Sequence, residues 1–152
     1  MPDVNSVHTA SSNTDMQTIA TALAVAKSRQ DIDEAMRIYH PDIVLETPPF
    51  GTVGRGADEV RAQLGIFFQI FPDYEVALEN SAFAGEDMIG WGRIRVTLTG
   101  EFANRRGNGT RAEVPVFIVF RFRDGRCIYE SFNFDLASLC RQSGLPAEAL
   151  VA

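Results

Sequence analysis

Basic charge, cysteine and long apolar runs are all scarce in this sequence. Its 152 residues hold 14 Lys and Arg against 20 Asp and Glu, which gives a net charge of −6. A nucleic-acid binder needs a basic face that replaces counterions on phosphates, so this balance disfavours that class. No apolar run reaches the roughly 20 residues that cross a bilayer, so no membrane partner or membrane-spanning segment is predicted.

Cys127 and Cys140 form no C-x-x-C pair and have no nearby histidine. Neither a metal site nor a redox motif is therefore predicted, and two buried thiols are favoured over a disulfide. The polar N-terminus "MPDVNSVHTASSNTD" lacks the apolar segment of a signal peptide. We expect a cytoplasmic protein with a disordered tail at residues 1–14 and a single domain at residues 15–152.

Apolar spacing predicts helices early in the chain and strands later. Helical periodicity covers residues 16–30, 31–40 and 57–71. A short strand is predicted at 43–47, and strand-like patterns cover residues 74–84, 88–102, 112–123 and 126–135. Asp124-Gly125 between two apolar runs is a strong hairpin signal, and a last helix follows at 136–145. This order predicts an α+β fold with one curved sheet and helices on its concave face.

One glycine-rich segment, "FGTVGRG", spaces its glycines as G-x-x-G-x-G rather than G-x-G-x-x-G. No clear strand–helix unit surrounds it. A turn-rich connection is therefore predicted there, and a phosphate-binding loop is not.

Five segments match a known family in order and spacing: "GRGADEVRAQL", "FPDYEV", "AGEDMIGWGRIRVTLTGEF", "VFIVFRFRDGRCIYESFNFD" and "LASLCRQSGL". Over about residues 15–145 the chain resembles the SnoaL-like polyketide cyclases of the nuclear-transport-factor-2-like superfamily. The resemblance implies a cone-shaped α+β barrel of one strongly curved, mainly antiparallel sheet with three N-terminal helices on its concave face. It also implies a deep apolar pocket, frequent dimers through the sheet, and aldol ring closure without metal or cofactor.

In that family an acid on the final strand moves protons on the substrate, and it maps to Asp135. Beside aromatic side chains the charged form of this carboxyl would be disfavoured and its pKa raised, which suits proton transfer. The alternative is an N-cap for the following helix, which would hold the carboxyl ionised. Leu98 replaces the usual His and Phe132 the usual Trp, which counts against the family's aldol reaction in its usual form.

Related activities match less well. Ketosteroid isomerases carry a catalytic Asp where this chain has Thr47, and their second acid would fall near Ile118. Limonene-type epoxide hydrolases need an Asp–Arg–Asp set, and Arg93 and Arg95 have no nearby Asp. The residues therefore disfavour both chemistries in their known form.

A polar row alternates along the final strand: Tyr129, Ser131, Asn133 and Asp135. It is either pocket lining or the exposed face of the sheet. In the second case Glu130 is the exception, because it shares the face of Phe132 and Phe134. A bulge near the strand end could reverse the assignment.

The remaining substrate-binding candidates come from three other segments. Trp91 alternates with Arg93 on the long strand, where the row forms a pocket wall, a solvated face or a dimer interface. Phe117 on the next strand is a further candidate. Tyr39 would either donate a hydrogen bond into a pocket or pack in the core.

Together with these residues, the resemblance implies a cofactor-free acid/base enzyme for an apolar polyketide- or terpenoid-like molecule. It would cyclise, isomerise or hydrate that molecule, with Asp135 transferring the proton and Asn133 and Trp91 orienting the substrate. A second copy of the chain is the expected protein partner, in a homodimer. The alternative is a non-catalytic small-molecule-binding or dimerisation module of the same fold.

Overall fold

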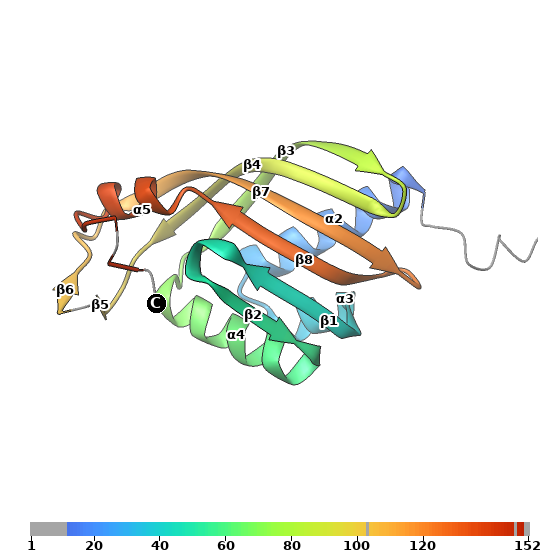
Figure 1. Cartoon of the computed structure of the whole chain (residues 1–152), viewed down its shortest axis with the longest axis horizontal. Coiled ribbons are helices and arrows are strands. Elements are labelled where there is room, and N and C mark those ends of the chain that lie inside the picture. The colour runs from blue at the N-terminus through green and yellow to red at the C-terminus, as the bar shows by residue number, and fades with distance from the viewer. Residues whose placement is uncertain (1–11, 103, 148, 151–152) are drawn as a thin grey trace, which may run out of the picture.

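A six-stranded sheet dominates the computed structural model, which describes residues 12–102, 104–147 and 149–150 (Figure 1). Its strand order is β2-β1-β8-β7-β4-β3. The strands are β1 (Tyr39–Thr47), β2 (Thr52–Arg55), β3 (Glu75–Ala84), β4 (Asp87–Thr97), β7 (Arg111–Arg123) and β8 (Arg126–Phe134). Neighbours run antiparallel except β1 and β8, which are parallel. The predicted α+β class and mainly antiparallel curved sheet are confirmed; the sheet ends in β2 and β3 and does not close.

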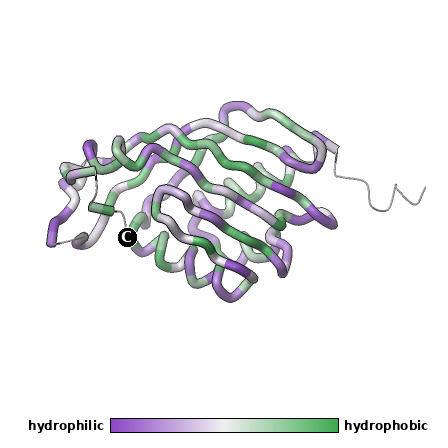
Figure 2. The backbone as a smooth tube through the Cα atoms, viewed as in Figure 1, coloured by the Kyte–Doolittle hydropathy of each residue, from purple (hydrophilic) through white to green (hydrophobic). Residues whose placement is uncertain are grey.

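Three N-terminal helices cover one face of this sheet, as predicted. They are α2 (Asn13–Ser28), α3 (Ile32–Ile38) and α4 (Gly56–Ile70). α2 packs against β3, β4 and β8, and α4 packs against β1 and β2. α2 buries Met16, Ala20 and Leu23, which recur at helical spacing. In Figure 2 hydrophobic stretches lie where the helices meet the sheet. No helix within the described ranges is long and apolar enough to span a membrane.

Capping side chains set where the first two helices begin. Ser12 Oγ accepts a hydrogen bond from Asp15 N at 3.1 Å, so α2 starts at Asn13, inside the segment predicted as a tail. Residues 1–11 of that predicted tail lie outside the described residues. Asp31 caps α3 in the same way, through Glu34 N at 3.0 Å. The helix then ends at Ile38, because Tyr39 is already extended and begins β1.

Two segments differ from the sequence-based expectation. The predicted turn-rich segment at 50–56 contains part of the 3-10 helix η1 (Pro48–Phe50) and the edge strand β2, which pairs with β1. The predicted strand at 88–102 ends at Thr97, and Gly100 adopts a φ of +87° that an extended strand does not allow. Beyond it, β5 (Glu101–Phe102) pairs with β6 (Arg105–Arg106) as a separate ribbon.

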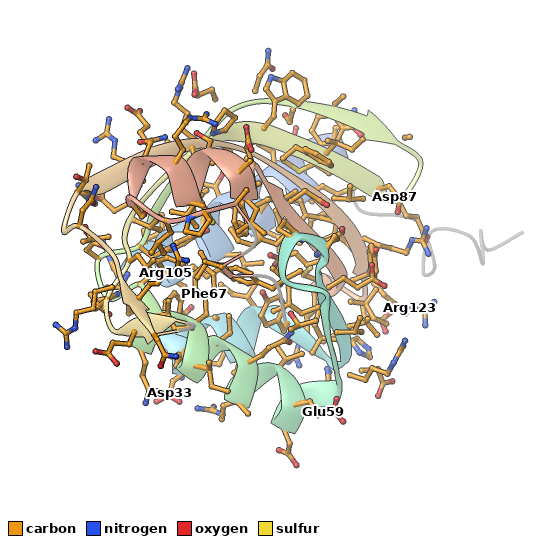
Figure 3. The ribbon with its side chains drawn as sticks, turned by 60° about the vertical axis from the view of Figure 1, so that its left-hand side comes forward. Asp33, Glu59, Phe67, Asp87, Arg105 and Arg123 are labelled. Carbon is orange, nitrogen blue, oxygen red and sulfur yellow. The ribbon has the colours of Figure 1, made fainter. Side chains whose placement is uncertain are left out.

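The core lies between the helices and the sheet. Figure 3 shows the two sides of α4: Phe67 lies among the side chains between helix and sheet, whereas Glu59 points outward. At the far end of the chain, α5 (Leu136–Gln142) packs against β7 and buries Leu139 and Cys140. Both cysteines are buried and form no disulfide with each other, as predicted.

Candidate functional site

A cavity of about 260 Å³ lies between α4 and the inward side of β1 and β8. Most of its wall is apolar: Leu45, Phe50, Leu64, Ile66, Phe67, Phe68, Ile70, Phe71, Phe132 and Leu150. The volume lies near the lower end of the range for small-molecule pockets. A small, largely apolar molecule is the ligand that such a space accommodates.

Phe67 organises the aromatic part of this wall. Its ring centroid lies 5.0 Å from that of Phe71, 5.3 Å from Tyr74 and 5.8 Å from Phe132. Tilted and edge-to-face arrangements of this kind are the favoured ones for aromatic pairs. The rings therefore support one another and define the shape of the cavity. Phe132, which stands where the family usually has Trp, is part of this cluster.

Glu130 is a buried carboxylate that lines the cavity. Lys27 Nζ donates to Oε1 at 2.8 Å and to Oε2 at 2.7 Å, and the Tyr39 hydroxyl donates to Oε1 at 2.6 Å. A buried charge persists only with such partners. Because a carboxylate has about four acceptor positions, roughly one position on Oε2 remains for another donor.

Glu130 lies inward with Phe132 and Phe134 by regular alternation, and an irregularity in β8 brings Cys127 to the same face. Arg121 of β7 pairs with Tyr129, and Phe122 pairs with Cys127, so Ile128 is an extra residue in β8. As a result Cys127 and Glu130, although three residues apart, are both fully buried. The alternative in which the polar row is the outer face, with Glu130 as the exception, is the one observed.

Lys27 reaches this carboxylate from the last turn of α2. The Lys27 side chain is only 9% exposed, and its Nζ lies 5.3 Å from the centroid of the Tyr39 ring. A cation suits the negative end of a helix dipole and the face of an aromatic ring. Glu130, Lys27 and Tyr39 thus form one buried unit, which we call the carboxylate triad.

Tyr74 lies beside the carboxylate triad and lines the cavity at 2% exposure. Burial, followed by the nearby Glu130 charge, raises the pKa of Tyr74 well above its ordinary value. The phenol therefore stays protonated at neutral pH and can donate a hydrogen bond. Within the described part of the chain its hydroxyl has no hydrogen-bond partner, so a ligand oxygen is a fitting acceptor.

Asp135 lies outside the cavity. It is exposed, and its Oδ1 accepts a hydrogen bond from Ser138 N at 3.0 Å, as the N-cap of α5. The alternative of a helix cap, left open by the sequence, is therefore the observed geometry. The physical reason is position: Asp135 follows the last residue of β8, where the free N–H groups of α5 compete for its carboxylate.

Four predicted substrate-binding residues lie on the sheet face turned away from the cavity. Trp91 is 41% exposed and pairs across the sheet with Phe117, which is 50% exposed and pairs with Asn133. Asn133 donates to Ser131 on its own strand, and Arg93 lies 3.7 Å from Glu79. The structure brings these side chains together, but strand alternation places them opposite to Glu130.

Tyr39 is the predicted candidate that belongs to the site, and it binds Glu130 rather than lining the cavity. Sequence reasoning missed Lys27 and Tyr74 and treated Glu130 only as an exception. Two signals were present: an acid in an apolar row of β8, and Lys27 four residues after Leu23 on the apolar face of α2. A buried acid and a buried base in one small domain suggest an ion pair.

The described residues offer little support for a metal site or for a cysteine nucleophile. They contain no group of three or more His, Cys, Asp or Glu side chains placed to hold a metal ion. Burial raises the pKa of the Cys127 thiol well above its ordinary value, so this group is a poor nucleophile at neutral pH. The carboxylate triad and Tyr74 are therefore the groups through which the cavity can act on a ligand.

Comparison with known proteins agrees with this architecture. A family model described as "SnoaL-like domain" matches residues 20–130, so the chain belongs to the SnoaL-like domain family. No curated protein matches the chain.

Solved structures share the fold. A putative SnoaL-like polyketide cyclase from Jannaschia sp. CCS1 has a TM-score of 0.76 at 20% identity, covering 88% of this chain and 94% of its own. A hypothetical protein from Catenulispora acidiphila DSM 44928 with a ketosteroid isomerase-like fold, in complex with trimethylamine, has a TM-score of 0.76 at 19% identity, covering 86% and 95%. IdmH, a putative polyketide cyclase from Streptomyces antibioticus, has a TM-score of 0.73 at 20% identity, covering 85% and 98%. The TM-scores show that these proteins share the fold of this chain.

Proposed function

We propose that this protein binds a small, largely apolar molecule and transfers a proton on it, with Glu130 as the acid/base group. The observation that carries the proposal is a fully buried carboxylate at the wall of an apolar cavity, with one acceptor position left on Oε2. Glu130 thereby takes the role that the sequence suggested for Asp135. Chemistry of this kind is common to cyclisation and isomerisation, which both begin by removing a proton next to a carbonyl.

The residues around Glu130 have separate tasks in this proposal. Glu130 Oε2 accepts a proton from a carbon next to a ligand carbonyl, and the Tyr74 hydroxyl donates a hydrogen bond to the carbonyl oxygen as negative charge develops there. Lys27 offsets the charge of the carboxylate, and Tyr39 keeps Oε1 occupied so that Oε2 faces the ligand. The proton then returns from Glu130 to another atom of the ligand, which leaves the enzyme unchanged.

Family membership supports a polyketide-like ligand, since two structural neighbours carry the description of putative polyketide cyclases. A fused or aromatic ketone combines an apolar body with an enolisable carbonyl. The aromatic rings around Phe67 suit such a body, because they offer edges and faces rather than polar groups.

The test uses 2-tetralone, a bicyclic ketone with exchangeable protons next to its carbonyl. In deuterated buffer at neutral pH, the protein should accelerate deuterium uptake above the buffer rate, as followed by proton NMR. Glu130→Gln keeps the shape and removes the base, so the acceleration should fall by about 100-fold or more. Glu46→Gln is the matched control, because Glu46 lies on the neighbouring β1 and binds Tyr129 instead. Unchanged acceleration in Glu130→Gln would rule out Glu130 as the base.

A non-catalytic binding module is the second candidate, favoured by the completeness of the carboxylate triad. Lys27 and Tyr39 already hold Glu130 through three hydrogen bonds, and in this reading the ion pair only supports the cavity wall. In that case 2-tetralone should bind, and the wild-type protein should not exceed the buffer rate of exchange.

We also propose self-association through the outer sheet face. Ile89, Trp91 and Phe117 are each 41–50% exposed on neighbouring strands, which is a surface that a second copy can cover. Trp91→Glu should then convert a dimer to a monomer in sedimentation-velocity analysis. A wild-type monomer at micromolar concentration would contradict this proposal.

A further inference from the structure

We infer that Lys27 is a nucleophile, which captures an apolar ketone or aldehyde in the cavity as an imine. Its ε-amine condenses with the ligand carbonyl beside Glu130. The inference rests on the proposed function in that it concerns the same cavity and the same carbonyl ligand. It adds a covalent step to a site for which only proton transfer has been proposed.

Lys27 is the only lysine among the 14 Lys and Arg residues of the chain, and it is buried. Its side chain is 9% exposed and lines the main cavity. A second cavity of about 10 Å³ is bordered by Lys27, Tyr74 and Glu130, which also line the main one. Because Nζ binds the Glu130 carboxylate, the amine end of Lys27 lies where the two cavities meet.

The amine has one N–H that the described residues leave unused. Nζ donates to Glu130 Oε1 at 2.8 Å and to Oε2 at 2.7 Å. An ammonium carries three donors, and within the described part of the chain no acceptor binds the third. This third position is where a bond from nitrogen to a ligand carbon can form without displacing a protein group.

The ion pair with Glu130 survives the reaction. An ammonium and a ketone give an iminium ion and one water molecule, so the nitrogen keeps its positive charge. A neutral adduct would leave the buried carboxylate without its cation, which is strongly destabilising. The buried pair therefore tolerates an imine at Lys27, in its protonated form.

Glu130 moves the protons that the condensation needs. Its Oε2, 2.7 Å from Nζ, takes one proton and frees the lone pair, which bonds to the carbonyl carbon. The carboxyl then returns this proton to the former carbonyl oxygen. A second proton passes from nitrogen to oxygen in the same way, the C–O bond breaks, water leaves and the C=N bond forms. Glu130 is again a carboxylate at the end.

The iminium ion then assists the proposed proton transfer. A positively charged nitrogen withdraws electrons from the neighbouring C–H bond more strongly than a neutral carbonyl oxygen does. Glu130 therefore removes the proton from that carbon more readily, and the electrons move onto the Lys27 nitrogen as an enamine forms. Reprotonation and addition of water release the ligand and restore the amine.

Reductive trapping tests the inference without an activity assay. The wild-type protein is incubated with 2-tetralone and sodium cyanoborohydride at neutral pH, and the modified residue is located by peptide mass spectrometry. We expect one reduced tetralyl group on Lys27. Because the chain has no other lysine, the N-terminal amine is the competing primary amine, and peptide mapping separates the two sites.

Arg93→Lys is the matched control, because it adds a lysine amine on the outer sheet face, where the Arg93 side chain is 53% exposed. In this variant Lys27 should be labelled at least about 10-fold faster than the introduced amine, since the cavity holds the ketone next to Nζ. Equal labelling of the two amines, or no adduct on Lys27, overturns the inference.

Lys27→Arg separates the inference from the proposed function. Arg keeps a cation beside Glu130 but forms no imine with a ketone, so deuterium exchange into 2-tetralone should fall toward the buffer rate. Exchange that depends on Glu130, with no adduct on Lys27, leaves the proposed function and removes the covalent step. An adduct on Lys27 without exchange leaves the covalent step and removes the proton transfer. If Lys27→Arg does not fold, trapping in the wild-type protein and in Arg93→Lys still decides the inference.

Discussion

The two faces of the sheet carry opposite kinds of residue, and only one of them bounds the cavity. The outer face displays Trp91 and Phe117, which are about half exposed. The inner face holds Glu130 at 0% exposure, bound by Lys27 and Tyr39. Aromatic and basic residues in an alternating row resemble a binding site in the sequence, but alternation alone does not say which face is covered. In this chain the buried charge, and not the alternating row, lies at the cavity wall.

Ion pairs on the two faces differ in the same way. Arg93 lies 3.7 Å from Glu79 on the outer face, and both side chains are more than half exposed. Lys27 lies 2.7 Å from Glu130 with side chains 9% and 0% exposed. Exposed pairs contribute little because water screens them, whereas a buried charge without its partner is strongly destabilising. Substitutions on the two faces should therefore change the free energy of unfolding by different amounts.

Lys27→Met should produce the largest effect. It leaves the Glu130 carboxylate buried without its cation, and we expect the free energy of unfolding to fall by about 3–5 kcal/mol. Urea denaturation measures this change. Arg93→Met, the same substitution type on the outer face, should change stability by less than about 1 kcal/mol. Similar losses in the two variants would remove the energetic distinction between the faces.

Alkaline pH should destabilise the fold through the inner face. Burial, reinforced by the Glu130 charge, raises the pKa of Cys127 and Tyr39 well above their ordinary values of 9.0 and 10.0. The folded state therefore holds these protons after the unfolded chain has lost them, and stability falls as pH rises above about 9. Between pH 8 and 10.5 we expect a loss of about 2–3 kcal/mol in urea denaturation, at about 1.4 kcal/mol per pH unit and group.

Two variants show which face of the sheet causes the loss of stability at alkaline pH. Cys127→Ala should abolish most of the decline, because it removes the inner-face group that begins to titrate first. Tyr129→Phe is the control, since Tyr129 lies on the outer face, is only partly buried and donates a hydrogen bond to Glu46. A decline that persists in Cys127→Ala and disappears in Tyr129→Phe would contradict the prediction.

Asp135→Ala should have the smallest effect. Losing the cap of α5 should lower the free energy of unfolding by about 1 kcal/mol, as measured in urea. Asp135→Asn should retain most of that stability, because Asn is an equally good cap. A loss above about 3 kcal/mol in Asp135→Ala would indicate a role beyond capping.

Local patterns were sufficient to predict most of the elements. The α2 periodicity and the Asp124-Gly125 hairpin both depend on residues close together in the chain, and the structure confirms them. The predicted end of the second helix at residue 40 was less accurate, because α3 already ends at Ile38.

The site depends on contacts that no local pattern contains. Lys27 and Glu130 are 103 residues apart, and they meet only because α2 packs on the sheet. Alternation puts Glu130 on the face of Phe132 and Phe134, but no local pattern shows that this face is the one the helices cover. Asp135 shows the opposite limit: a cap and a catalytic acid look alike in the sequence, and only the position of Ser138 N distinguishes them.

Deuterium exchange into 2-tetralone by Glu130→Gln and Asp135→Asn, measured side by side, tests the central claim most directly. Both substitutions convert a carboxylate to an amide of the same shape, one on the cavity wall and one in solvent at the start of α5. We predict a loss of about 100-fold or more in Glu130→Gln and wild-type exchange in Asp135→Asn. Wild-type exchange in Glu130→Gln together with a large loss in Asp135→Asn would contradict the claim that the inner face carries the chemistry.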